Sequence, residues 1–546
     1  MKNRTIRFCF ALIAGIALTS TAWAQWPSNP ALNLDLADGI GDQVQPKLLP
    51  LQNGGWYLSW FDNPAHGYGV YVQGLDPGGV PLAPHNGLRV AKLGLSSTED
   101  YGLSVDTAGN ELVAFLDDRE GSNIQVTASK ISPKGQMLWG AMGIQLTNDQ
   151  NSNNDPKIAG TSDGDAVVGW SSNSNVVLQK LDPNGVPLWG TGVVLSASGQ
   201  NFVLADLHAA DNGSVIVSWV SGTGFGSPQI LLATKLSNTG APLWGTVHVF
   251  DGGSLQFGEF PYFILDGSGG AVFSWYSNSP TLQVYAQHIL ANGTEAFPHN
   301  GSVGSNNINN VHVSPTVAYL ANTGETFLFW EEQDSLQDMS GVSGQKFNST
   351  GAQEWGSNGL TIVPLGNDQQ LFVQTVQIGT GAQIFWVDEP SFDSDTMNAA
   401  RLDGSGNLTC PITPISTVVS GKSRPQAGIG PSGLSAVVWQ DDRITGDGNI
   451  YLQNVNNDCS LGYLPIQCSA LHSASAKCVN GNLNIDITLN GLINDGNSLT
   501  LEVNSIDHTL PIVKKRAMLS VQGQGSNTLL LTNPAGCVQQ KTVQCP

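Results

Sequence analysis

The sequence predicts an all-β fold built from one repeated unit, and three observations carry this prediction. A strand-end aromatic residue recurs every 49–56 residues. Its copies are Trp60, Phe115, Trp170, Trp219, Trp275, Trp330, Trp386 and Trp439. The 64 glycines, 28 prolines and only 12% charged residues are typical of short strands joined by tight turns. Beyond the first 25 residues no stretch has a helical pattern. Eight such units predict an eight-bladed β-propeller of four-stranded blades.

The third unit illustrates how each blade is expected to be built. Its four strands are predicted at Pro156–Ala159, Asp165–Trp170, Val176–Leu181 and Val186–Leu195. The turns between them contain Gly and Asn, which tolerate positive φ, and the middle strands are rich in valine. A second aromatic residue recurs before the fourth strand, as at Trp189, and its repetition favours a core position between blades over a sugar-stacking surface.

The eighth unit has only three strands, since the repeat is interrupted at Cys459. The segment beginning at Trp26 resembles the fourth strand of the other units. Residues 26–36 are therefore predicted to supply the missing outer strand and to close the ring, which would remove its open edges. The propeller is expected to span residues 25–463.

The first 24 residues have the pattern of a secretory signal peptide. Lys2, Arg4 and Arg7 precede a short apolar run, and Ala22-Trp23-Ala24 forms a cleavage site, so the mature chain is predicted to begin at Gln25. A membrane anchor is the alternative, which the shortness of the apolar run disfavours. The product is expected to be secreted or periplasmic. Cleavage removes three basic residues and takes the formal charge from −21 to −24, which disfavours nucleic acid and anionic lipid as partners.

Six cysteines remain after cleavage, and an oxidising compartment favours disulfides over a metal site. They are Cys410, Cys459, Cys468, Cys478, Cys537 and Cys545. Cys410 and Cys459 are predicted to tie neighbouring blades. The other four are expected to staple residues 468–546, where alternating strands suggest a small immunoglobulin-like β-sandwich, and the sequence leaves their pairing open.

One unit carries a recognisable motif. It reads Trp439-Gln440-Asp441-Asp442-Arg443 and then Asn449-Ile450-Tyr451-Leu452-Gln453, and Phe115-Leu116-Asp117-Asp118-Arg119 is a further match. These units resemble the W-x-D-x-R and D-I-Y-x-Q repeats of secreted bacterial β-propeller proteins, with a distant likeness to sialidases. The resemblance implies the propeller fold for residues 26–463 but no particular activity, because such propellers do many things.

Acidic residues follow the strand-end aromatic in five of the eight units, and uncharged polar residues replace them in the other three. In a closed ring these five loops would form one continuous arc on a face suited to ligand binding. The candidate ligand-binding residues are Asp62, Asp117, Asp118, Arg119, Glu331, Glu332, Asp388, Asp441, Asp442 and Arg443. The alternative is structural: the carboxylates cap their own loops and pair with Arg119 or Arg443.

Two function classes stay open. The first is an exported, non-catalytic binding or scaffold protein that recognises a glycan or a protein. The second is a carbohydrate-active enzyme, a glycosidase or lyase, that uses carboxylates of the arc. No complete catalytic motif is present, since Gly160-Thr161-Ser162-Asp163-Gly164 lies on a hairpin turn. Clustered carboxylates in short loops also predict a calcium site, with Asp393, Asp395, Asp441, Asp442 and Asp447 as candidate ligands.

Overall fold

The computed structural model describes residues 25–545 except 65–66, 96–97, 120, 122, 225, 279–280, 445, 463–469, 480, 491–497, 524, 534–536 and 539. The predicted signal peptide and Cys468 therefore lie outside the described residues. The described part is all-β, and its single helical element is the 3-10 turn η1 (Asp211–Gly213). Within that part, no helix has the length and apolarity needed to cross a membrane.

The first four repeats each form one antiparallel four-stranded sheet. Sheet 1 contains β2 (Gln43–Pro50), β3 (Trp56–Asp62), β4 (Gly69–Leu75) and β5 (Leu88–Lys92). Sheet 2 contains β6 (Gly102–Val105), β7 (Glu111–Asp117), β8 (Gln125–Ile131) and β9 (Ile144–Gln145). Sheet 3 contains β10 (Asn153–Gly160), β11 (Ala166–Ser172), β12 (Asn175–Leu181) and β13 (Val193–Leu195). Sheet 4 contains β14 (Asn201–Ala209), β15 (Val215–Gly222), β16 (Ile230–Leu236) and β17 (Val247–Phe250).

The next three repeats follow the same order. Sheet 5 contains β18 (Phe263–Leu265), β19 (Ala271–Ser277), β20 (Gln283–Ile289) and β21 (Ser302–Val303). Sheet 6 contains β22 (Val311–Leu320), β23 (Glu325–Gln333), β24 (Ser340–Phe347) and β25 (Leu360–Gly366). Sheet 7 contains β26 (Gln369–Ile378), β27 (Gly381–Glu389), β28 (Asp395–Leu402) and β29 (Leu408–Ser420).

Sheet 8 combines the two ends of this region. It contains β30 (Lys422–Ile429), β31 (Ser435–Asp441), β32 (Asn449–Val455) and, as its outer strand, β1 (Leu34–Ala37). Leu34 pairs with Leu452 and Ala37 with Ile450 in antiparallel register. The N-terminal segment therefore supplies the fourth strand of the last sheet.

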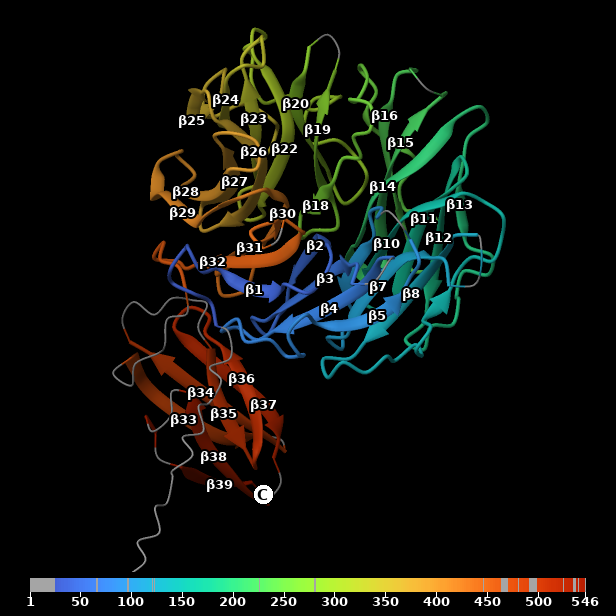
Figure 1. The fold of residues 1–546 in the computed structure, drawn as a ribbon. Helices are drawn as coiled ribbons and strands as arrows, with labels where there is room; N and C mark the ends of the chain where they lie inside the picture. The colour runs from blue at the N-terminus through green and yellow to red at the C-terminus, as the bar shows by residue number, and fades with distance from the viewer. Residues whose placement is uncertain are drawn as a thin grey trace, which may run out of the picture.

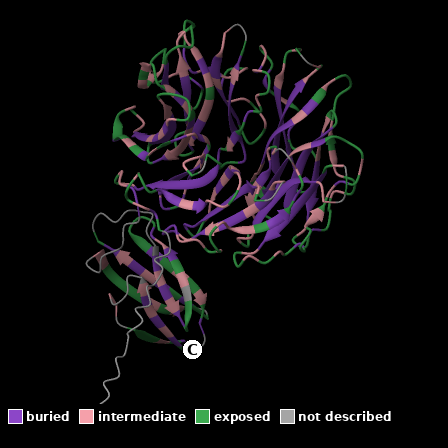
Figure 2. Ribbon diagram, in the orientation of Figure 1, coloured by how far each residue is buried: buried purple, intermediate pink, exposed green. Residues whose placement is uncertain are grey.

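The sheets lie around a common centre with the first strand of each innermost, which is the arrangement of a β-propeller (Figure 1). Neighbouring first strands contact one another, and β30 contacts β2. Each second strand is buried on both faces between neighbouring sheets (Figure 2), as in β7 and β11. This burial explains why their sequences are nearly continuous apolar runs.

A recurring tryptophan joins consecutive sheets. The indole of Trp244, just before β17, donates a hydrogen bond to Ala291 O at 2.9 Å and packs on the turn glycine Gly293 of sheet 5. A Cβ at Gly293 would stand 2.8 Å from the ring, and the φ of +83° also favours glycine. Trp26, which precedes β1, makes the same two contacts with sheet 1, a 3.2 Å hydrogen bond to Pro77 O and packing on Gly79.

The junction between sheets 7 and 8 uses a disulfide instead. Cys410 in β29 is bonded to Cys459 with a Cα–Cα distance of 5.5 Å, as the sequence predicts. The Cys459 amide closes the turn after β32 on Asn456 O, and its φ is +71°. Cys459 thus occupies the turn position that glycine holds in the other sheets. The covalent bond replaces the contact between tryptophan and glycine.

Two further sheets form the C-terminal part. One contains β33 (Leu471–Val479), β34 (Asn482–Leu489) and β37 (Arg516–Gln522), and the other contains β35 (Ser498–Val503), β36 (Ile506–Pro511), β38 (Gly525–Asn533) and β39 (Lys541–Cys545). Apolar side chains of both sheets, such as Leu483 and Leu501, pack in one core. Cys478 of the first sheet is disulfide-bonded to Cys545 of the second, and Cys537 is disulfide-bonded as well.

Candidate functional site

The first strands of several sheets surround a central cavity of about 670 Å³. Its walls come from β2, β18, β22, β26 and β30, together with the loop before β18. In sheet 1, Gln43 lies opposite Asp62 and Lys47 lies opposite Ser59. Lys47 is therefore at the middle of the sheet, and Gln45 lies toward the end where the second strand runs into the acidic loop. The cavity therefore extends from the middle of the first strands toward the face for which the sequence predicts ligand binding, and Glu331 of sheet 6 lines it.

Strained backbone lines this cavity. Gln45, Ser314, Phe372 and Arg424 adopt positive φ values of 51–55° where the ladder of the first strand is interrupted by a register shift, and Asp155 does the same in sheet 3. Such conformations cost about 1–3 kcal/mol each and cluster at functional sites. In the orientation of the Gln45 side-chain amide that satisfies its hydrogen-bond partners, its nitrogen donates to Glu99 O and its oxygen accepts a hydrogen bond from Arg424 Nη1 at 2.5 Å.

One wall of the cavity carries a network of opposite charges. Lys47 Nζ lies 2.7 Å from Asp100 Oδ1, and Lys157 also pairs with this carboxylate. The Tyr262 hydroxyl donates a hydrogen bond to Asp100 Oδ2 at 3.2 Å. Burial opposes ionisation of Asp100, but the two lysines outweigh it and hold its pKa far below the usual range. Asp100 is therefore a fixed negative charge that orients the tyrosine ring.

Two other acidic groups of the cavity, Glu331 and Glu259, differ from Asp100 because their pKa values are raised. Burial raises the pKa of Glu331 to about 7, although the Phe372 amide donates a hydrogen bond to its carboxylate at 2.6 Å. Burial also raises the pKa of Glu259, which accepts a hydrogen bond from the Tyr276 amide at 2.9 Å. The second oxygen of Glu259 is buried and has no hydrogen-bond partner among the described residues. Each carboxyl can therefore hold a proton near neutral pH.

Aromatic rings complete the lining. Phe260, Tyr262 and Phe372 line the cavity, and their exposed fractions are 40%, 54% and 40%. Flat apolar rings beside fixed hydrogen-bonding groups are the lining that a ligand with both apolar faces and hydroxyl groups requires.

The acidic loop residues of sheets 1 and 2 are engaged within the protein. Asp62 is buried and accepts a hydrogen bond from Gln43 at 3.1 Å. Asp117 accepts hydrogen bonds from Arg119 Nε at 2.8 and 3.0 Å, and Arg119 also donates to Met142 O at 2.8 Å. Asp118 accepts a hydrogen bond from the Gly94 amide at 2.9 Å. These contacts are those of the structural alternative, and the ligand-binding role of these loops stays a prediction.

The acidic residue of sheet 8 is the most enclosed of the set. Asp441 is fully buried and lies 2.6 Å from Arg443 and 3.3 Å from Lys422. The Trp439 indole donates a further hydrogen bond to it at 2.8 Å. The Arg443 guanidinium stacks 3.9 Å from the centre of the Tyr451 ring. Desolvation opposes ionisation of Asp441, but these donors lower its pKa below the usual range.

Three of the other proposed calcium ligands lie at the junction of sheets 7 and 8. The carboxylates of Asp393 and Asp442 both face Gly421. Asp395 accepts the Lys422 amide at 2.6 Å, and burial raises its pKa to about 6. Asp447 lies in the loop between β31 and β32. The carboxylates of Asp393, Asp395, Asp441 and Asp442 thus lie near Gly421 and Lys422. Calcium binding there stays a prediction.

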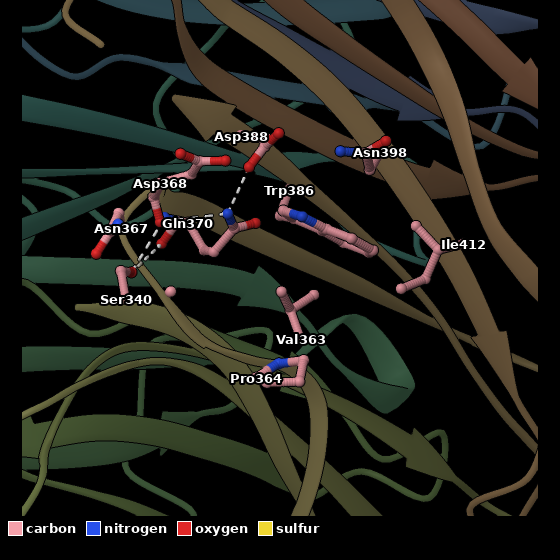
Figure 3. Close-up of a pocket in the computed structure, with 11 residues that line it drawn as sticks. Ser340, Val363, Pro364, Asn367, Asp368, Gln370, Trp386, Asp388, Asn398 and Ile412 are labelled. Atoms are coloured by element: carbon pink, nitrogen blue, oxygen red, sulfur yellow. Dashed lines mark hydrogen bonds between the residues drawn. The ribbon is translucent and has the colours of Figure 1, made fainter. Parts of the chain in front are cut away.

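Asp388 and Glu332 lie on sheets 7 and 6. Asp388 borders a smaller pocket of about 300 Å³, where Gln370 donates a hydrogen bond to its carboxylate beside the Trp386 ring (Figure 3). Glu332 accepts hydrogen bonds from Asn310 at 2.6 Å and from Ser343. Among the predicted ligand residues named on sheets 6 and 7, Glu331 alone lines the central cavity.

Comparison with known proteins adds a likeness of fold. No protein-family model and no curated protein matches the sequence. Among solved structures, the Dos1 propeller is 12% identical with a TM-score of 0.42, covering 78% of this chain and 95% of its own. The polysaccharide lyase Uly1 is 10% identical with a TM-score of 0.39, covering 78% and 91%. The Penicillium chrysogenum alpha-L-arabinanase is 9% identical with a TM-score of 0.32, covering 55% and 92%. None of these likenesses assigns an activity to this chain.

Sequence reasoning missed most of the cavity. A signal was present: four of the five positive-φ residues on the first strands precede proline, as in Gln45-Pro46 and Arg424-Pro425. Proline has no backbone N–H to donate to the ladder, so a repeated X-Pro near the start of a first strand marks the interrupted ladder. Phe260, Tyr262 and Glu259 lie in a loop of one unit and have no repeat pattern to reveal them.

Proposed function

We propose that this chain is an exported glycan-binding protein whose ligand occupies the central cavity. The observation that carries the proposal is the set of exposed rings around the cavity, Phe260, Tyr262 and Phe372. Sugar rings present apolar C–H faces that pack on aromatic rings, and their hydroxyl groups need donors and acceptors at fixed positions. Asp100 and Arg424 offer such groups beside the rings.

The strained first strands support the same proposal. Gln45, Ser314 and Arg424 hold positive φ at a cost in stability, and all three line the cavity. A rigid site whose side chains are positioned before the ligand arrives loses less entropy on binding. The hydrogen bond between Gln45 and Arg424 further restricts these two side chains.

A carbohydrate-active enzyme is the second candidate, and Glu331 favours it. This carboxyl is buried in the cavity wall with a pKa of about 7, so it is suited to act as a general acid near neutral pH. Glu259 lines the same cavity, but burial raises its pKa as well, so it does not supply the ionised carboxylate that such an enzyme also needs. The sequence contains no motif that selects between the two candidates.

We also propose a more specific interpretation of the fold. The eight sheets of residues 25–463 would be the blades of one ring closed by β1, with the repeats of the secreted bacterial type. Support comes from the pairing of β1 with β32, the contact of β30 with β2, and the Trp26 hydrogen bond to Pro77. Residues 468–546 would form an immunoglobulin-like sandwich, supported by two sheets with a common core. Residues 1–24 would be the signal peptide of a secreted or periplasmic protein.

A glycan array followed by calorimetric titration of the strongest-binding glycan tests the function. Phe260→Ala and Tyr262→Ala should each weaken binding about tenfold, the effect of losing roughly 1.4 kcal/mol of ring contact. Phe392→Ala is the matched control, because Phe392 is 85% exposed and does not line the cavity. An array without hits, or unchanged affinity in both cavity variants, would reject glycan binding at this site.

The same glycans separate the enzyme from the binding protein. Incubation with the wild-type chain should leave the glycan intact if the chain only binds. Release of new reducing ends that Glu331→Gln abolishes, with binding retained, would instead establish the enzyme.

A further inference from the structure

A compact set of metal-binding groups lies outside the central cavity, at the junction of the N-terminal strand and sheet 1. Asp35 is on β1, Asp38 follows that strand, and His85 is in the loop between β4 and β5. One donor atom from each lies within 4.8 Å of the other two. Among the described residues, this is the single group of three potential ligands with such spacing.

The backbone on both sides holds these groups in place. The Asp38 amide donates a hydrogen bond to Asn86 Oδ1 at 2.8 Å, and the Asn86 amide donates to Leu36 O at 3.3 Å. These bonds join β1 to the loop that carries His85. The His85 Nε2 atom lies 2.7 Å from Asp38 Oδ1. The three ligands are therefore assembled without any ion.

One carboxylate oxygen of Asp35 has no donor that would explain its position. Its Oδ1 atom is buried and has no hydrogen-bond partner among the described residues. Two carboxyl groups in contact require a shared proton or a cation between them. The His85 imidazole beside them supplies that cation when it is protonated, and when neutral it is a further metal ligand.

We propose that Asp35, Asp38 and His85 bind a divalent transition-metal ion, of which zinc is the representative, and that this ion fastens β1 to sheet 1. One imidazole nitrogen and two carboxylate oxygens are ligand types that zinc accepts, and a water molecule would complete its usual four ligands. Calcium prefers six to eight oxygen ligands, so this donor set disfavours it. The ion would bridge the outer strand of sheet 8 and sheet 1, in addition to the Trp26 contact and the backbone bonds around Asn86.

Calorimetry and thermal unfolding of the chelator-treated mature chain test this site with zinc chloride. The wild-type chain should bind one zinc ion and unfold at a temperature a few degrees higher in its presence, because a ligand of the folded state stabilises it. Bound cobalt should give the visible absorption of a site with a nitrogen ligand. His85→Ala and Asp35→Asn should each weaken zinc binding at least tenfold.

His299→Ala is the matched control. His299 is an exposed histidine that contacts Asp251 and Glu295 on another part of the surface, so this variant should retain zinc binding. Since the His85 side chain is half exposed, its removal should leave the fold intact, which circular dichroism checks. Absence of zinc binding in the wild type, unchanged affinity in His85→Ala, or a response to calcium alone would overturn the proposal.

Discussion

Removal of the Trp26 side chain should destabilise the propeller as strongly as removal of an equivalent internal tryptophan. Trp26 is 3% exposed, and its indole donates a hydrogen bond to Pro77 O while packing on Gly79. Trp244 is also 3% exposed and makes the same contacts with Ala291 O and Gly293. The two differ in one respect: Trp26 links the two ends of the repeat region.

The expected change in unfolding temperature follows from the burial of the tryptophan ring and from the size of the propeller. Truncating a buried tryptophan to alanine costs about 3–5 kcal/mol. A propeller of roughly 430 residues has an unfolding entropy of about 0.9 kcal/mol per degree at the usual value per residue. Trp26→Ala should therefore lower the unfolding temperature by about 3–6 °C, and Trp244→Ala should do the same.

Differential scanning calorimetry of the mature chain and the two variants measures this shift. Equal losses would indicate that the N-terminal segment is as firmly packed as an internal repeat. A Trp26→Ala variant that unfolds within 1 °C of the wild type, while Trp244→Ala shows the expected loss, would refute ring closure by the N-terminal segment.

Three further predictions concern the disulfide, pH and calcium. Replacing the bridge between Cys410 and Cys459 by Ala and Gly should lower the free energy of unfolding by up to about 4 kcal/mol in urea titrations, because it closes a 49-residue loop; an unchanged midpoint would contradict this. Burial raises the pKa of Glu331 to about 7, so its contribution to the free energy of unfolding is fully present below pH 4.5 and is lost as the pH rises through 7. The Glu331→Gln variant should therefore have a free energy of unfolding up to about 3 kcal/mol higher than the wild type at pH 8, and little changed at pH 4. Glu332→Gln is the control, because the lowered pKa of Glu332 gives the opposite dependence, and parallel pH profiles would contradict the assignment. Millimolar calcium should give heat and a thermal shift that Asp393→Asn weakens, and a titration without heat would leave these loops as solvated surface.

Local pattern explains why so much of the fold could be predicted from the sequence. The aromatic residue at the end of each second strand, such as Trp170, is buried between sheets, so each unit must repeat it. Turn residues with positive φ, such as Gly185, mark the hairpins in the same way. Both signals lie within about 50 residues of chain, and they also predicted the pairing of Cys410 with Cys459. The missing outer strand was predicted at residues 26–36, whereas the structure places it at Leu34–Ala37, because the residues from Trp26 onward pack on sheet 1 without forming a strand.

The sequence by itself thus determined the repeat, its four strands and the exchange of the N-terminal strand. Only the tertiary structure decided where the candidate site lies. Glu331, Phe372 and Arg424 come from three different sheets, and they meet because the first strands converge on the centre. The carboxylates that the sequence favoured, such as Asp441, instead satisfy nearby arginine and tryptophan donors. The physical reason is that a linear pattern records which residue ends a strand, whereas the neighbours of its side chain depend on how the sheets pack.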